Sequence, residues 1–140
     1  YVIASERAKF VSAYTSSGLT PDGSSTYYLA KHVGLLRAKE LMLTNRVLTA
    51  AEAQSWGLVN RVVPPENVMD KACAMAQQIA SGPTMAFGGV KRLLDTAFSD
   101  GLETQLDRET RSIADMMRTN DGPAGISAFL AKETPRFEGT

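Results

Sequence analysis

The chain has almost none of the residues that build covalent or metal-held frameworks. It contains one cysteine and one histidine. A single cysteine cannot form a disulfide within the chain, which fits a reducing compartment. Cys73 lies in an Ala- and Met-rich helical pattern, so we expect it to be a small core residue. A single histidine, His32, cannot build a metal cluster or a Ser-His-Asp set, so we expect a structural role for it and no metal site.

An excess of charge and a long apolar run are also absent. Lys and Arg together number 15, as do Asp and Glu, so the chain has no broad basic field that would attract nucleic acid. No apolar run approaches the ~20 residues of a membrane span, and no signal-peptide pattern is visible. We therefore expect neither nucleic acid nor membrane among the partners, and a cytoplasmic location (an organellar matrix in a eukaryote).

The residues that are present predict a mixed α/β protein. Because 44% of the 140 residues are hydrophobic, the chain can form a real core. Thr49 followed by Glu52 predicts a capped helix start. Pro64-Pro65 ends the last expected strand, longer helices follow, and no linker is long enough to divide the chain. The apolar spacing predicts short strands over 1–4, 9–11 and 58–63, and helices over 24–33, 35–44, 49–57, 66–81, 84–99, 102–118 and 123–131.

The most informative segment is a turn around Asp22. Pro21 pre-sets a turn φ, and Gly23 permits backbone dihedrals that other residues resist. Ser24 and Ser25 follow and can cap the helix that begins there. Asp22 is therefore either a helix cap or an acid held at the mouth of a pocket, and the residue types alone leave both roles open.

A series of short motifs follows Asp22 in a fixed order and ends in an apolar helix and a Pro-Arg-Phe tail. The motifs are Val33-Gly34, Arg37-Ala38, Glu40 to Asn45, Thr49-Ala50, Glu52-Ala53, Trp56 to Val59, Ala128 to Lys132 and Pro135 to Phe137. This ordered set resembles the C-terminal half of the crotonase superfamily, the enoyl-CoA hydratase/isomerase family. The resemblance covers essentially the whole chain.

The resemblance implies an α/β fold, namely the C-terminal part of a crotonase-type ββα spiral followed by a helical trimerisation region. Residues 1–65 would form the spiral part with the active-site turn, and residues 66–140 the helices that make trimer contacts and cover CoA. The family's fold is longer at its N-terminus. We therefore expect this chain to be a fragment, inactive alone, whose N-terminal partner half supplies the N–H groups that stabilise the thioester oxygen.

The implied substrate is an acyl-CoA thioester, with no cofactor other than the CoA that the substrate carries. Asp22 falls where the family's isomerases place their single acid. Such an acid takes a proton from C2 of a 3-enoyl-CoA and returns it at C4. Val11, Tyr14 and Leu19 would form the apolar pocket wall beside Asp22.

Two other reactions of the family are alternatives. The hydratases use two glutamates, of which the second falls on Tyr14, so water addition is disfavoured here. In the aryl-CoA dehalogenases an aspartate at the position of Asp22 is a nucleophile, and an aromatic residue stands where Tyr14 does. Those enzymes also need a histidine base, which would lie in the N-terminal half.

The resemblance also implies CoA contacts and assembly. Lys132 matches a lysine that contacts the CoA nucleotide of a neighbouring subunit, although a solvated tail lysine is the alternative. Ile113 matches an apolar position beside the adenine, with core or interface packing as its alternative. The family forms homotrimers that often pair into hexamers. A non-enzymatic binding subunit, including an RNA-binding one, is a further class; the zero net charge speaks against RNA, and Asp22 speaks for catalysis.

Overall fold

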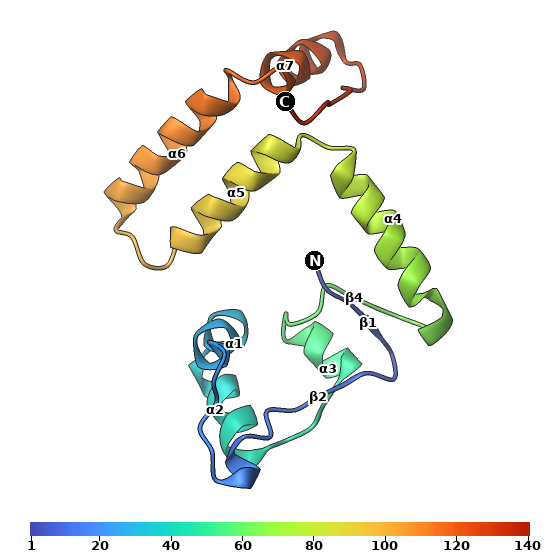
Figure 1. The fold of residues 1–140 in the computed structure, drawn as a ribbon, viewed down its shortest axis with the longest axis vertical. Helices are drawn as coiled ribbons and strands as arrows, with labels where there is room; N and C mark the ends of the chain where they lie inside the picture. Colours follow the sequence, from blue (N-terminus) through green and yellow to red (C-terminus); the bar gives the residue numbers. More distant parts are fainter. The chain divides into compact units, whose positions relative to one another are not determined.

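The computed structural model describes every residue from 1 to 140 and contains two compact units, residues 1–73 and 74–140 (Figure 1). Helix α4, Val68–Ala80, carries the chain from the first unit into the second, and the boundary between the two units lies inside this helix. None of the helices is both long enough and apolar enough to cross a lipid bilayer.

The first unit combines four short strands with three α-helices. Strands β1 and β4 are parallel, with Ala4 opposite Val62, and strands β2 and β3 are antiparallel, with Phe10 opposite Leu48. The strand regions expected near residues 1–4, 9–11 and 58–63 are thus present, but shorter. The elements are β1 Ile3–Ser5, β2 Lys9–Phe10, η1 Thr15–Ser17, α1 Ser25–Val33, α2 Leu35–Thr44, β3 Leu48–Thr49, α3 Ala50–Ser55, β4 Arg61–Val63 and η2 Pro65–Asn67.

A small buried cluster joins these strands to α2 and α3. It consists of Ala4, Leu41, Leu48, Ala53 and Val59, and Leu48 is fully buried. Alanines at two of the five positions let the backbones approach closely, while the leucines and valine provide the apolar area whose burial stabilises the unit. Phe10, the last residue of β2, packs against this cluster. The segment that carries Asp22 starts directly after Phe10.

Helix α3 begins with the capping box that the sequence predicts. The Thr49 hydroxyl accepts a hydrogen bond from the Glu52 backbone N–H (3.3 Å), and the Glu52 carboxylate accepts one from the Thr49 backbone N–H (2.9 Å). These bonds satisfy two N–H groups that have no partner within the helix. They also lower the pKa of Glu52, because the Thr49 backbone N–H stabilises the ionised carboxylate. The capping box is confirmed.

The second unit consists of the end of α4 and three further helices: α5 Thr84–Thr96, α6 Leu102–Met116 and α7 Asp121–Ala131. Helices α5 and α6 lie side by side and run in opposite directions (Figure 1). They approach closely at Gly89, where a Cβ would lie 3.2 Å from the Ser112 hydroxyl oxygen. The four helices expected in this region are present, with ends within a few residues of the predicted ones.

The carboxylate of Asp121 ties the C-terminal tail to the start of α7. Asp121 is buried, and its two oxygens accept hydrogen bonds from the backbone N–H groups of Glu138 (2.7 Å) and Gly139 (2.9 Å). The Thr140 carbonyl in turn accepts from the Asn120 N–H (2.8 Å). A buried carboxylate needs such partners, because burial without hydrogen bonds is costly.

Large apolar side chains of the second unit face outward in this chain. Leu102, Leu106 and Ile113 of α6 are 76%, 52% and 69% exposed. The expectation that Cys73 is a core residue is wrong for the chain as it stands, since Cys73 is exposed. Cys73 lies on α4, a helix with no fully buried residue in this chain.

Candidate functional site

A pocket of about 440 Å³ lies in the first unit, next to the turn that carries Asp22. Of the three residues expected at a pocket wall beside Asp22, Val11 and Tyr14 line this pocket, whereas Leu19 is 62% exposed and lies outside the lining. Most of its exposed wall is apolar. The lining residues are Phe10, Val11, Ser12, Tyr14, Ser25, Tyr28, Leu29, His32, Leu41, Met42 and Leu58.

Four of these lining residues come from α1 and were not predicted as a set. Ser25, Tyr28, Leu29 and His32 are spaced by three and four residues, which places them on one face of the helix. That spacing was a readable signal in the sequence. His32 therefore lies at the pocket rather than in the core, and it is exposed.

The position of Tyr14 is fixed by the short helix η1, which follows it directly. The Thr15 hydroxyl donates a hydrogen bond to the Met42 carbonyl (2.6 Å) and lies 3.0 Å from the side-chain oxygen of Asn45. Gly18 ends η1 with a φ of 72°, a left-handed conformation that glycine adopts without strain. These contacts hold η1, and with it Tyr14, against the C-terminal end of α2.

The position of Asp22 is fixed by a left-handed turn. Gly23 and Ser24 have φ values of 59° and 63°, and the Ser25 N–H (3.0 Å) and hydroxyl (2.7 Å) both donate to the Asp22 carbonyl. The expected capping role of Ser24 is wrong, because its side chain makes no capping hydrogen bond in this conformation. A serine in the left-handed region costs on the order of 1–3 kcal/mol, and such residues cluster at functional sites.

The side chains of Tyr14 and Asp22 meet. The Tyr14 hydroxyl donates to Asp22 Oδ1 over 2.9 Å. This hydrogen bond, together with the negative charge of Asp22, raises the pKa of Tyr14, so the phenol stays protonated at neutral pH. The carboxylate thus pairs with Tyr14, while the N–H groups of Tyr27 and Tyr28 in the first turn of α1 bond to the Ser24 carbonyl. This geometry gives no support to Asp22 as a helix cap.

The two residues suggested for CoA contacts lie in the second unit. Lys132 is exposed and ends α7 in a left-handed conformation, with a φ of 57°. Ile113 projects from α6 and is mostly exposed. Neither residue lines the pocket beside Ser112 or the pocket beside Phe137 in this unit. Their role in binding CoA stays a prediction.

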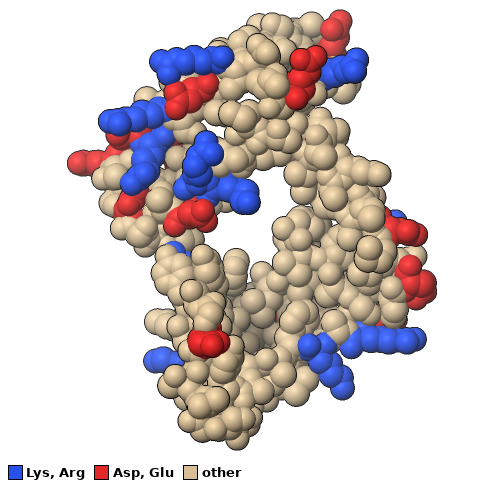
Figure 2. Space-filling model, viewed as in Figure 1, with Lys and Arg blue, Asp and Glu red and all other residues tan.

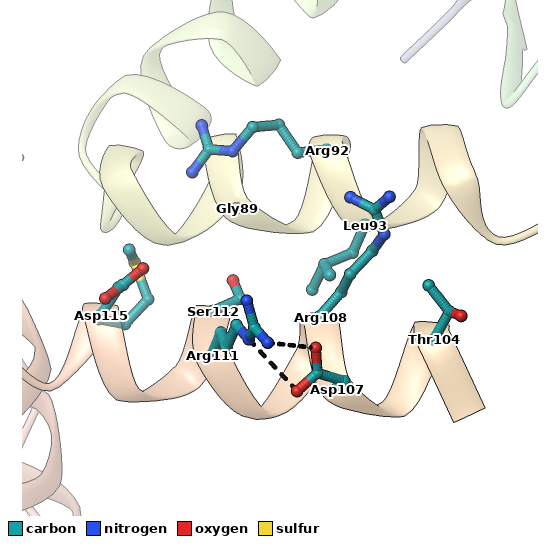
Figure 3. Close-up of a pocket in the computed structure, with 10 residues that line it drawn as sticks. Gly89, Arg92, Leu93, Thr104, Asp107, Arg108, Arg111, Ser112 and Asp115 are labelled. Carbon is teal, nitrogen blue, oxygen red and sulfur yellow. Dashed lines mark hydrogen bonds and ion pairs between the residues drawn. The ribbon is translucent and has the colours of Figure 1, made fainter. Parts of the chain in front are cut away.

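A second pocket, of about 450 Å³, lies between α5 and α6 and is rich in charge (Figure 3). Arg111 pairs with Asp107 (2.9 Å) and Arg108 pairs with Asp100 (2.6 Å), so two of its three arginines already have acidic partners. Acidic and basic side chains also alternate over these helices on the face that Figure 2 shows. Most of the charged side chains that line this pocket are in ion pairs, and its wall is not mainly apolar. We therefore place the candidate site at Asp22.

The chain is similar to known proteins along its whole length. All residues from 1 to 140 match the family described as enoyl-CoA hydratase/isomerase. The chain is 39% identical to the 1,2-epoxyphenylacetyl-CoA isomerase of Escherichia coli (strain K12) over 138 residues, which cover 99% of this chain and 53% of that protein. It is 38% identical to 4-chlorobenzoyl coenzyme A dehalogenase-1 of an Arthrobacter species over 131 residues, which cover 94% of this chain and 48% of that protein.

Solved structures show the same fold. The crystal structure of an enoyl-CoA hydratase/isomerase from Cupriavidus metallidurans CH34 superposes with a TM-score of 0.93 at 37% identity, covering 99% of this chain and 52% of that one. The fold is therefore the C-terminal part of the crotonase architecture. The chain spans about half the length of the curated relatives it matches. On these findings, the chain belongs to the enoyl-CoA hydratase/isomerase family.

Proposed function

We propose that the enzyme containing this chain isomerises an enoyl-CoA thioester with Asp22 as its single acid–base group. The observation that carries the proposal is the placement of the Asp22 carboxylate, on a fixed turn beside a pocket with a mostly apolar wall. In this reaction Asp22 takes a proton from C2 of a 3-enoyl-CoA, the double bond shifts to C2–C3, and the same proton returns at C4.

The remaining requirements of this reaction concern the thioester and the CoA. N–H groups outside residues 1–140 would stabilise the enolate oxygen that forms when the proton leaves C2. Lys132 would contact the CoA phosphates, since its side chain is exposed and cationic. Ile113 would pack near the adenine. No cofactor is needed for this proton transfer.

A hydratase is the less favoured reaction because it uses two carboxylates. The side chain that donates to Asp22 is a phenol, whose pKa is raised by Asp22 itself. A protonated phenol cannot take a proton from water at neutral pH, so it cannot replace the second glutamate. The Tyr14–Asp22 pair therefore supports one-acid chemistry.

A dehalogenase reaction is the second candidate, supported by the aromatic rings of Phe10, Tyr14 and Tyr28 in the pocket lining. In that reaction Asp22 attacks the ring carbon that bears the halogen, and halide leaves as the aryl ester forms. Water then attacks the ester carbonyl, which releases the hydroxyaryl product and restores the carboxylate. The name of the Arthrobacter relative describes such a reaction for that protein.

The test compares the complete enzyme with its Asp22→Asn variant on a 3-enoyl-CoA and on a 4-halobenzoyl-CoA. For the isomerase we expect wild-type turnover of the enoyl substrate, and a loss of about 10²–10⁴-fold in Asp22→Asn. For the dehalogenase we expect halide release and an aryl ester on Asp22 that mass spectrometry detects after rapid quenching. Asp95→Asn is the matched control, because Asp95 is exposed on α5 in the second unit. Full activity of Asp22→Asn on the substrate that the wild type turns over would reject the proposal.

A further inference from the structure

We propose that Tyr14 is a positioning residue, which holds one oxygen of the Asp22 carboxylate so that the other is presented to the substrate. This inference rests on the proposed role of Asp22. Tyr14 Oη donates to Oδ1 over 2.9 Å, and within this chain Oδ2 has no hydrogen bond or ion pair. A carboxylate held at one oxygen cannot rotate freely about its Cβ–Cγ bond, so its second oxygen keeps a fixed direction.

Tyr14 is also the residue that connects the pocket with the acid. Its side chain belongs to the pocket lining, whereas Asp22 itself is exposed and does not. The hydroxyl at the far end of the ring reaches Oδ1. A substrate group bound in the pocket would therefore contact the same ring that orients the acid.

Both ends of the hydrogen bond are held by backbone structure. On one side, η1 is tied to α2 through the 2.6 Å bond from Thr15 to the Met42 carbonyl. On the other side, the Asp22 carbonyl accepts two hydrogen bonds from Ser25, across a turn whose Gly23 and Ser24 are left-handed. Because both backbones are fixed, losing the Tyr14 hydroxyl frees the carboxylate without releasing the loops.

The Tyr14 phenol keeps its proton at neutral pH. The carboxylate raises the pKa of Tyr14 above its ordinary value of 10, so the phenol remains a donor at neutral pH. A positioning group should behave in this way, since it orients the acid without itself exchanging a proton.

The experiment compares Tyr14→Phe with Tyr27→Phe in the complete enzyme. Tyr27 is a suitable control because it lies outside the pocket lining and its hydroxyl bonds to Lys31. For Tyr14→Phe we expect kcat to fall by about 10²-fold with KM changed by less than about threefold, because misplacement of the acid affects the transition state more than binding. Tyr27→Phe should retain the wild-type kcat.

A crystal structure of Tyr14→Phe provides a second readout that a merely structural role would not change. We expect an intact η1 and Asp22 turn, with the Asp22 carboxylate rotated or in more than one conformation. A wild-type kcat in Tyr14→Phe, or an unchanged single carboxylate orientation, would overturn the inference. Asp22→Asn distinguishes failure of this inference from failure of the proposed function. If Asp22→Asn is inactive while Tyr14→Phe has wild-type activity, only the positioning role fails. If Asp22→Asn is active, the proposed function fails.

Discussion

The hydroxyl of Thr15 lies 2.6 Å from the carbonyl oxygen of Met42 and joins the segment before Asp22 to the last turn of α2. Met42 is one of the last four residues of α2, whose carbonyls have no partner within the helix. Thr15 therefore satisfies an acceptor of α2 and places Tyr14 with the same contact.

We expect Thr15→Val to destabilise the enzyme by about 1–2 kcal/mol, since it leaves the Met42 carbonyl without its partner at nearly constant side-chain volume. It should also lower kcat, because η1 positions Tyr14. Chemical denaturation and steady-state kinetics measure the two effects. Ser16→Ala is the control: its hydroxyl bonds to Ala13 within the same exposed turn, so a change within about 0.5 kcal/mol is expected. Equal stability of the two variants would contradict the prediction.

Ser24 provides a test of the left-handed turn. Replacing a left-handed residue by a β-branched one is unfavourable, so Ser24→Val should destabilise by about 1–2 kcal/mol and reduce kcat as Asp22 moves. The free energy of unfolding of Ser24→Gly should lie within about 1 kcal/mol of the wild-type value, because glycine adopts this conformation without strain. The pair of variants is compared by denaturant unfolding, and a Ser24→Val variant of wild-type stability would show that the turn does not need its positive φ.

The capping box of α3 makes part of the stability depend on pH. The pKa of Glu52 is lowered from its ordinary 4.5, chiefly by the Thr49 backbone N–H and hydroxyl. A lowered pKa stabilises the fold above the unfolded value, so this contribution is complete above about pH 4.5 and is lost as pH falls through the folded pKa. Unfolding curves of wild type and Glu52→Gln should therefore differ above pH 4.5 and converge as the pH falls through the lowered pKa of Glu52 in the folded state. A stability difference that stays constant from pH 7 down to acid would contradict this origin.

The exposed face of α6 leads to a prediction about assembly. Leu102 and Leu106 are more than half exposed in this chain, and we expect another subunit to cover them in the complete enzyme. Leu106→Glu should then weaken association at least about tenfold, equivalent to about 1.4 kcal/mol, because it places an unpaired charge in an apolar interface. Sedimentation velocity over a concentration series measures this. Glu109→Gln on the same helix is the control, and identical sedimentation of both variants would rule out α6 as the contact.

Local patterns predicted much of the first unit. Helix α2 has the expected bounds, Leu35–Thr44. Gly34 precedes it and Asn45 follows it, both with a positive φ, which glycine and asparagine adopt more readily than other residues. The capping box at Thr49 was likewise readable, since its two residues are three apart and bond to each other. Such features depend on neighbours in the sequence.

Contacts between segments were harder to predict. The Tyr14–Asp22 hydrogen bond depends on two turns, one ended by Gly18 and one containing a left-handed Ser24, and residue types do not fix how such turns combine. The exposure of Cys73 could not be predicted, because an apolar helical pattern shows which face wants burial and not which partner covers it. The structural role expected for His32 followed from its being the only histidine, whereas its spacing from Ser25 and Tyr28 places it on the pocket face.

The buried cluster of Ala4, Leu41, Leu48, Ala53 and Val59 takes no side chain from residues 11–25. The segment that holds Tyr14 and Asp22 is thus supported by the framework without being part of its interior. We expect substitutions of the Tyr14 and Asp22 side chains to cost little folding free energy, because burial elsewhere maintains the fold, whereas Thr15 and Ser24 carry the backbone contacts of the segment. A framework divided in this way is well suited to evolving or engineering new reactions, and we expect exchange of the pair at positions 14 and 22 to change the chemistry while the architecture persists.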